Sequence, residues 1–483
     1  MAKKSIKDKA VSAMFWNSIG KFGTMGISFI SNMVLARLLM PSDFGTIGML
    51  HIFIAIAEVF ILGGFGQALI QKKNPTHSDY TTVFYWNLVA SIFVYIILFI
   101  SAPWIASFYE MPQLKSILRV MGITLIIQSF SVVQSNQLVK QLKFRVLTVR
   151  NILAVSISTV VAVIMALKGF GVWSLVCSSI VSSFASVILL WSQSSWRPTW
   201  EFSMSSLKEL FAFGGLMALS SLIDKIYSEI QGLIIGKWYS AADLGYYNQA
   251  HRLEQVPMSA LSQIVSTVSF PVFSSLQNDK EKLLRGVRMN LISVSYLNFP
   301  LSFLMMIVGA PLIRLVYGPN WDAAIPYFQI LCFGGMMFTT NSLNNQVIKA
   351  LGKSNIYLYA QLVKRSIGVG LIILGAMHGV WGLLVAVAAN SYIFYLISAF
   401  INSRLLDYGL KKQLKDIGGT FLVSGVLAAV LYWASLQISI NHYVLLPIVL
   451  IAYVGLFILL SRVFKLKGYE IYMDVIKSKF KRK

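Results

Sequence analysis

The sequence predicts an all-α membrane protein with about 14 transmembrane helices, of which the first twelve form two copies of one six-helix bundle. Three observations support this fold class. Of the 483 residues, 57% are hydrophobic and 12% are charged, and the mean hydropathy is +0.70. Lys and Arg collect in every second loop, and segments about 200 residues apart resemble one another. Lipid must therefore solvate most of this chain.

Apolar stretches that can each cross a hydrocarbon core of about 30 Å recur along the whole length. Turns containing Pro, Gly, Asn or Asp, such as MPSDFG and YGPNWD, separate these stretches. The expected spans are 14–39, 44–70, 82–108, 115–138, 147–167, 171–191, 208–238, 244–272, 287–316, 326–348, 356–377, 380–403, 417–438 and 443–462.

The distribution of positive charge predicts the orientation, because short cytoplasmic loops carry an excess of Lys and Arg. The basic N-terminus, which we expect to remain as part of a first helix, lies on the same side as the basic C-terminal tail. The basic residues of that side are Lys3, Lys4, Lys7, Lys9, Lys72, Lys73, Lys140, Lys143, Arg145, Arg150, Lys280, Lys282, Arg285, Arg288, Lys349, Lys353, Arg404, Lys411, Lys412 and Lys415. Both termini are therefore predicted to be cytoplasmic.

An internal repeat divides the chain into three parts. SFISNMVLARLLMPSDFG from Ser28 lies over SEIQGLIIGKWYSAADLG from Ser228, and NQLVKQL from Asn136 lies over NQVIKAL from Asn345. The copies begin on the same side of the membrane, so a pseudo-two-fold axis along the membrane normal relates them. We expect an N-terminal bundle at 1–206, a second bundle at 207–412, and two additional helices with a basic tail at 413–483. Two such bundles predict a rocking mechanism around a central cleft.

Motifs for enzymatic or metal chemistry are absent from the sequence. We find no Walker A loop, HExxH, GxSxG or EF-hand loop, and Cys177 and Cys332 both fall in apolar stretches. We therefore expect no catalytic residues, no cofactor and no metal. The formal net charge of +23 is scattered between spans, which argues against a nucleic-acid partner.

Charged residues at membrane depth are the strongest functional candidates, since each costs about 2.5 to 3.5 kcal/mol at a helix centre. We interpret the cations as lining a hydrated cavity that binds an anionic group such as a pyrophosphate. The alternative is that Lys225 and Glu229 neutralise each other and that Lys21 snorkels to the surface. The predicted substrate-binding cations are Lys21, Lys225, Arg252, Lys364 and Arg365.

Four acidic residues at similar depth are candidates for coupling transport to H⁺ or Na⁺, and ion pairing explains them equally well. They are Glu58, Asp224, Glu229 and Glu254. Asp43 and Asp243 are expected to be N-caps of the helices that follow them. His51 and His251 could sense protons, but a structural role is favoured for both.

The sequence also resembles a known family. SAMFWNSIGKFGTMGISFISNMVLARLLMPSDFGTIGM, GFGQALIQKK and LIIGKWYSAADLGYYNQAHRLEQVP resemble Wzx-type O-antigen and exopolysaccharide flippases of the multidrug/oligosaccharidyl-lipid/polysaccharide exporter superfamily. The resemblance covers essentially the whole chain. Its DFG-type turn is moderately specific, and the helix plan supports it independently.

The resemblance implies a bacterial inner-membrane flippase for surface polysaccharide such as O-antigen, capsule or exopolysaccharide. Such a protein moves undecaprenyl-pyrophosphate-linked oligosaccharide from the cytoplasmic to the periplasmic leaflet, with membrane lipid and other polysaccharide assembly proteins as partners. A cation-coupled multidrug exporter of the same superfamily is the first alternative. A membrane glycan polymerase or ligase is less favoured, because the sequence lacks a large outer loop for a catalytic site.

Overall fold

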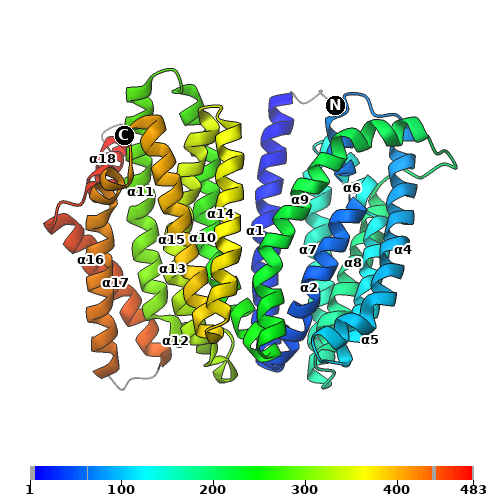
Figure 1. Ribbon diagram of the computed structural model, residues 1–483, viewed down its shortest axis with the longest axis horizontal. Coiled ribbons are helices and arrows are strands. Elements are labelled where there is room, and N and C mark those ends of the chain that lie inside the picture. Colours follow the sequence, from blue (N-terminus) through cyan, green and yellow to red (C-terminus); the bar gives the residue numbers. More distant parts are fainter. Residues whose placement is uncertain (1–5, 63, 438–441, 481–483) are drawn as a thin grey trace. The chain divides into compact units, whose positions relative to one another are not determined.

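The computed structural model describes residues 6–62, 64–437 and 442–480, and every regular element within these ranges is a helix (Figure 1). The helices are α1 (Ile6–Leu38), α2 (Pro41–Leu62), α3 (Phe65–Gln71), α4 (His77–Phe108), α5 (Gln113–Ser129), α6 (Val132–Lys140), α7 (Phe144–Leu167), α8 (Trp173–Gln193), α9 (Met204–Trp238), α10 (Ala241–Ser275), α11 (Lys280–Ile307), α12 (Gly309–Val316), η1 (Pro319–Trp321), α13 (Ala324–Ala350), α14 (Ser354–Ala376), α15 (Gly379–Leu406), α16 (Leu410–Gln437), α17 (His442–Val463) and α18 (Lys467–Phe480).

The predicted all-α membrane fold is confirmed. Among the described residues, 11 spans are long and apolar enough to cross a membrane, or up to 13 if each bent helix pair counts as one span. The bent pairs are α5 with α6, at 42°, and the two parts of α9, at 54°. The expected span at 326–348 corresponds to α13, which is not among the 11. With 27 residues α13 is about 40 Å long, but the polar sequence TTNSLNNQ in its second half lowers its hydropathy.

Packing divides the chain into two compact units, unit 1 (Met1–Gly245) and unit 2 (Tyr246–Lys483). In unit 1, α7 packs on α1 and α8, and α9 packs on α2, α3 and α4. In unit 2, α15 packs on α13 and α14, and α11 packs on α13 and α16. Figure 1 shows the long helices of each unit running side by side. The division at 206/207 follows the sequence repeat and not the packing, and it stays a prediction.

The repeated DFG-type turn forms a close backbone crossing within unit 1. A Cβ atom on Gly45 would run into the main-chain carbonyl of Ala241, and one on Gly245 would run into that of Pro41. Only glycine therefore fits at either position without moving the other helix. The turn recurs in both copies because each glycine packs against the backbone at the start of the other helix.

Asp43 and Asp243 cap their helices from inside the first turn, and not from the expected N-cap position before the helix. The Asp43 carboxylate accepts a hydrogen bond from the Met40 N–H at 3.0 Å, and that of Asp243 accepts one from the Ser240 N–H at 3.1 Å. Each aspartate is thus the third residue of its helix and bonds back to the residue before the helix. The N-cap assignment was therefore wrong by three positions, because a capping box places an acidic residue at this site.

Helix α18, in the predicted basic tail, docks on unit 2 through a buried carboxylate. Asp416 on α16 accepts hydrogen bonds from Lys467 Nζ at 2.7 Å, from Arg288 Nη2 at 2.7 Å and from the Tyr408 hydroxyl at 2.9 Å. The Tyr472 hydroxyl adds a bond to the Ser293 carbonyl at 3.3 Å. These contacts fix α11, α16 and α18 to one another.

Candidate functional site

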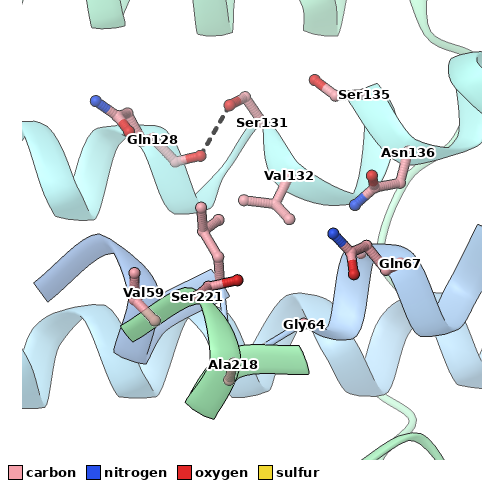
Figure 2. Close-up of a pocket in the computed structure, with 12 residues that line it drawn as sticks. Val59, Gly64, Gln67, Gln128, Ser131, Val132, Ser135, Asn136, Ala218 and Ser221 are labelled. Carbon is pink, nitrogen blue, oxygen red and sulfur yellow. Dashed lines mark hydrogen bonds between the residues drawn. The ribbon is translucent and has the colours of Figure 1, made fainter. Parts of the chain in front are cut away.

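A polar cavity of about 400 Å³ lies inside unit 1, between α2, α3, α5, α6 and α9 (Figure 2). Its polar side chains are all uncharged amides and hydroxyls. Gln67 and Asn136 point toward one another from α3 and α6, as Figure 2 shows. The polar lining residues are Gln67, Gln128, Ser131, Ser135, Asn136 and Ser221.

Breaks in three helices shape this cavity. Helix α5 ends at Ser129 and α6 starts at Val132, while α2 and α3 are separated at Gly64, which has a φ of 71°. The bend of α9 meets the second break, because a Cβ on Gly64 would collide with the backbone of Gly214. Broken helices within a membrane need a polar or hydrated surrounding for their freed backbone groups. The cavity supplies that surrounding and leaves amide and hydroxyl groups available to a ligand.

A line of charged side chains, which we call the α2–α9 strip, continues from the cavity between these two helices. Glu58 neighbours the wall residue Val59 and interacts electrostatically with Lys225 and His51. On α9, Lys225 follows the wall residue Ser221 by one turn. The strip comprises His51, Glu58, Lys225 and Glu229.

An ion pair forms the far end of the strip. His51 Nδ1 lies 3.0 Å from Glu229 Oε2, with 58% of the His51 side chain and 22% of the Glu229 side chain exposed. The expected ion pair between Lys225 and Glu229 along α9 is not among the ion pairs of the described residues, and Glu229 bonds instead to His51 on α2. A helix wheel places Ser221, Lys225 and Glu229 on one face at intervals of four residues.

The structure thus brings three predicted site residues of unit 1 together, namely Glu58, Lys225 and Glu229. Asp224 is exposed on a different face of α9, and Lys21 is exposed on α1. Whether these residues bind substrate or a coupling ion stays a prediction.

In unit 2, Glu254 lines a second, smaller cavity of about 90 Å³ between α10, α13 and α15. Its side chain is buried, and its carboxylate lies 3.6 Å from Nδ1 of His251. Gly335 on α13 provides the space, since a Cβ there would collide with the Glu254 carboxylate. Arg252 is exposed on the neighbouring face of α10. The predicted acid Glu254 and the predicted cation Arg252 are thus two positions apart in sequence but differ in environment.

Lys364 is fully buried and lines neither the polar cavity nor the smaller cavity. Its Nζ donates hydrogen bonds to Asn341 and Asn345 on α13 and to Ser398 on α15. Arg365, the next residue on α14, is half-buried. The predicted cations therefore occupy different environments, with Lys225 next to the polar cavity and Lys364 engaged within unit 2.

The neutral residues of the cavity are not among the predicted site residues, because amides and hydroxyls are common in membrane helices, whereas charges at membrane depth are rare. One signal was available: Gln128–Gln137 reads QSFSVVQSNQ, an unusually polar run inside an expected span. Arg150, which we expect on the cytoplasmic side at the start of the span 147–167, lies in α7 and donates a hydrogen bond from Nη1 to Ser135 Oγ at 2.8 Å. A cation therefore supports the cavity wall from behind.

Comparisons with known proteins agree with this architecture. Teichuronic acid biosynthesis protein TuaB of Bacillus subtilis (strain 168) is 25% identical over 449 residues, covering 91% of each chain. Lipopolysaccharide biosynthesis protein WzxC of Escherichia coli (strain K12) is 25% identical over 408 residues, covering 82% of this chain and 81% of WzxC. The structure of the lipid II flippase MurJ in an inward closed conformation matches with a TM-score of 0.76 at 16% identity, over 95% of this chain and 99% of MurJ. That match shows a shared fold.

A family model described as "Polysaccharide biosynthesis protein" matches residues 34–326, which is more than half of the chain. The matched region includes the repeated turns, the polar cavity, the α2–α9 strip and Glu254. It also includes GFGQALIQKK, LIIGKWYSAADLGYYNQAHRLEQVP and the part of the first motif from Val34 onward, and the family resemblance is confirmed. This multi-pass membrane protein therefore belongs to the polysaccharide biosynthesis protein family.

Proposed function

We propose that the protein is a flippase that moves lipid-linked oligosaccharide units across the membrane for the synthesis of surface polysaccharide. Its family membership, the biosynthetic names of TuaB and WzxC, and the fold it shares with a lipid II flippase support this function. The protein acts as a transporter and not as an enzyme.

One observation carries the proposal, namely a neutral polar cavity that continues into a charged strip inside membrane-spanning helices. Amides such as Gln128 and Asn136 can both donate and accept hydrogen bonds, as sugar hydroxyls require. A volume of about 400 Å³ falls in the range of small-molecule sites. Lys225, one turn from the cavity, supplies a positive charge for the pyrophosphate that joins glycan to lipid. The polyprenyl tail stays in the bilayer.

The full transport cycle is part of the proposal. Alternating access carries an undecaprenyl-pyrophosphate-linked unit from the cytoplasmic to the periplasmic leaflet of a bacterial inner membrane, with both termini cytoplasmic. Coupling to H⁺ or Na⁺ through Glu58, Asp224, Glu229 or Glu254 provides direction. Membrane lipid and other polysaccharide assembly proteins are the partners.

A flipping assay in proteoliposomes tests this function. A lipid-linked oligosaccharide with a labelled sugar is incorporated, and the label that becomes protected from a membrane-impermeant periodate reagent is measured over time. Protein-dependent protection is expected, and a Gln128→Leu/Asn136→Leu variant should slow it at least tenfold, about 1.4 kcal/mol. Gln141→Leu, an exposed position at the end of α6, is the matched control.

Two results would contradict the proposal. The first is an equal rate of protection in protein-free liposomes. The second is export of cationic drugs by the same proteoliposomes without any movement of the glycan, which would favour the multidrug exporter.

A further inference from the structure

The Lys364 ammonium in unit 2 is a buried cation that only uncharged groups surround. Its Nζ lies 3.0 Å from Asn341 Oδ1, 3.2 Å from Asn345 Oδ1 and 2.5 Å from Ser398 Oγ, and the Phe394 ring centroid is 5.9 Å away. Among the described residues, Lys364 forms no ion pair. Its side chain has no exposed surface. A charge in this position departs from the usual rule that buried ions have an ionic partner.

The geometry matches the charged form of the side chain. An ammonium group has three N–H donors and no acceptor, and here three oxygen atoms receive them. The Ser398 hydroxyl donates to Asn341 Oδ1 at 2.8 Å, so its oxygen is left to accept a proton from Lys364, and the lone pair of a neutral amine would have no donor. Oxygen atoms from amides and hydroxyls, together with an aromatic face, are also the groups that bind small monovalent cations. Lys364 therefore fills what is chemically a cation site.

The internal repeat shows what occupies the related position in unit 1. Asn345 corresponds to Asn136 in the matching NQ segments, and Asn136 lines the open polar cavity of about 400 Å³. In unit 1 the related helix is broken into α5 and α6, whereas α13 is continuous. One copy of the repeat thus has a cavity beside this asparagine, and the other copy has a lysine side chain.

We propose that Lys364 is a built-in cation, whose ammonium occupies a site on α13 and α15 that would bind a free monovalent cation of ammonium size if the side chain were removed. The site holds α13, α14 and α15 together through the three hydrogen bonds that this ammonium donates. Any ion that exchanges during transport must then bind elsewhere in the protein. This inference concerns stability and ion binding, and it does not depend on which substrate is moved.

Chemical rescue tests the site. The full-length Lys364→Ala variant is purified in detergent, and its thermal unfolding midpoint is measured in choline, ammonium, methylammonium and sodium chloride at equal ionic strength. Choline is too large for the site. We expect the midpoint to fall in choline and to rise by about 3 °C or more in ammonium or methylammonium. The wild-type protein should show the same midpoint in all four salts.

Two further variants keep the test decisive. Lys364→Met fills the space with an apolar chain of similar length, so its midpoint should fall and ammonium should not restore it. If Lys364→Ala is not recovered in folded form, Lys364→Gln leaves room and an acceptor for a cation and is compared in the same salts. An equal midpoint in choline and ammonium for the small or polar variant, or an equal rise in wild type, would overturn the proposal.

Discussion

The imidazole Nδ1 of His51 and the carboxylate Oε2 of Glu229 lie 3.0 Å apart and join α2 to α9. The two residues are 178 positions apart in the chain, so sequence patterns on one helix could not pair them. The bond closes the far end of the α2–α9 strip, and the polar cavity lies at its other end. Any change in the charge of His51 therefore acts on the wall of the cavity.

Protonation of this pair should make transport dependent on pH. An imidazole changes charge between about pH 5 and 8, and the charged groups that act on His51 are Glu229, Lys225 and Glu58. Protonated His51 forms an ion pair with Glu229, whereas neutral His51 forms only a hydrogen bond. We expect the flipping rate of the wild type to change severalfold over this range and the rate of His51→Gln to be flat.

The matched control for that experiment is His378→Gln, since His378 follows α14 and the one hydrogen bond described for its imidazole is to the Leu374 carbonyl of the same helix. Rates are measured in proteoliposomes with equal pH on both sides. A His51→Gln profile that follows the wild-type profile would remove this histidine from the transport cycle.

Removal of single cations should strongly slow export of the glycan. Lys225→Ala deletes the charge that we assign to the pyrophosphate, Arg252→Ala deletes a predicted substrate-binding cation of unit 2, and a charge-assisted hydrogen bond contributes about 1.5 to 3 kcal/mol. Losses of ten- to a hundredfold in flipping rate are therefore expected at normal expression. Lys168→Ala, an exposed lysine after α7, serves as control. Full surface polysaccharide in both variants would refute the cationic-site hypothesis.

Methyl groups at the repeated turn should destabilise unit 1. Gly45→Ala and Gly245→Ala each place a Cβ against a main-chain carbonyl of the opposite helix, and such overpacking costs about 2 kcal/mol or more. The melting temperature in detergent should fall by several degrees. Gly26→Ala and Gly370→Ala are controls, because nothing lies within 4 Å of their Cβ positions. Equal stability of the turn variants and the controls would contradict the reciprocal packing.

The carboxylate of Asp416 should be the main attachment of α18. Asp416→Asn removes the charge opposite Arg288 and Lys467, and loss of a buried ionic partner costs about 3 to 5 kcal/mol. Because both cations are about half exposed and can be rehydrated, we expect the lower value, with faster proteolysis of the C-terminal helix. Asp407→Asn is the control, since Asp407 pairs with Lys280 at the surface and should change stability by less than about 0.5 kcal/mol. Protease resistance in Asp416→Asn equal to that of the control would exclude this attachment.

Most of the fold could be predicted from the sequence, because helices that face lipid need long apolar stretches that hydropathy detects directly. The apolar stretches and the basic loops require no knowledge of tertiary contacts. Helix α13 was identified as a span although its second half is polar, and the structure shows that Asn341 and Asn345 face Lys364 there. Helix α18 was missed, since its amphipathic sequence resembles an ordinary charged tail.

Less of the candidate site could be predicted, for two physical reasons. Buried charge is conspicuous in an apolar sequence, so Lys225 and Glu229 were found, whereas Gln128 and Asn136 resemble ordinary helix-packing residues. The break between α5 and α6 falls at Phe130 and Ser131, where no Pro or Gly marks it. A cavity that depends on such a break depends on tertiary packing, which one sequence does not display.

The difference between the broken pair α5–α6 and the continuous α13 bears on how the protein can evolve. In a homodimer of identical bundles, every mutation would occur in both copies. With two copies in one chain, the first copy can acquire substitutions around the polar cavity while the second keeps Lys364. Adaptation to a new surface polysaccharide can then proceed by substitutions around Gln67, Gln128 and Asn136 without loosening the partner bundle.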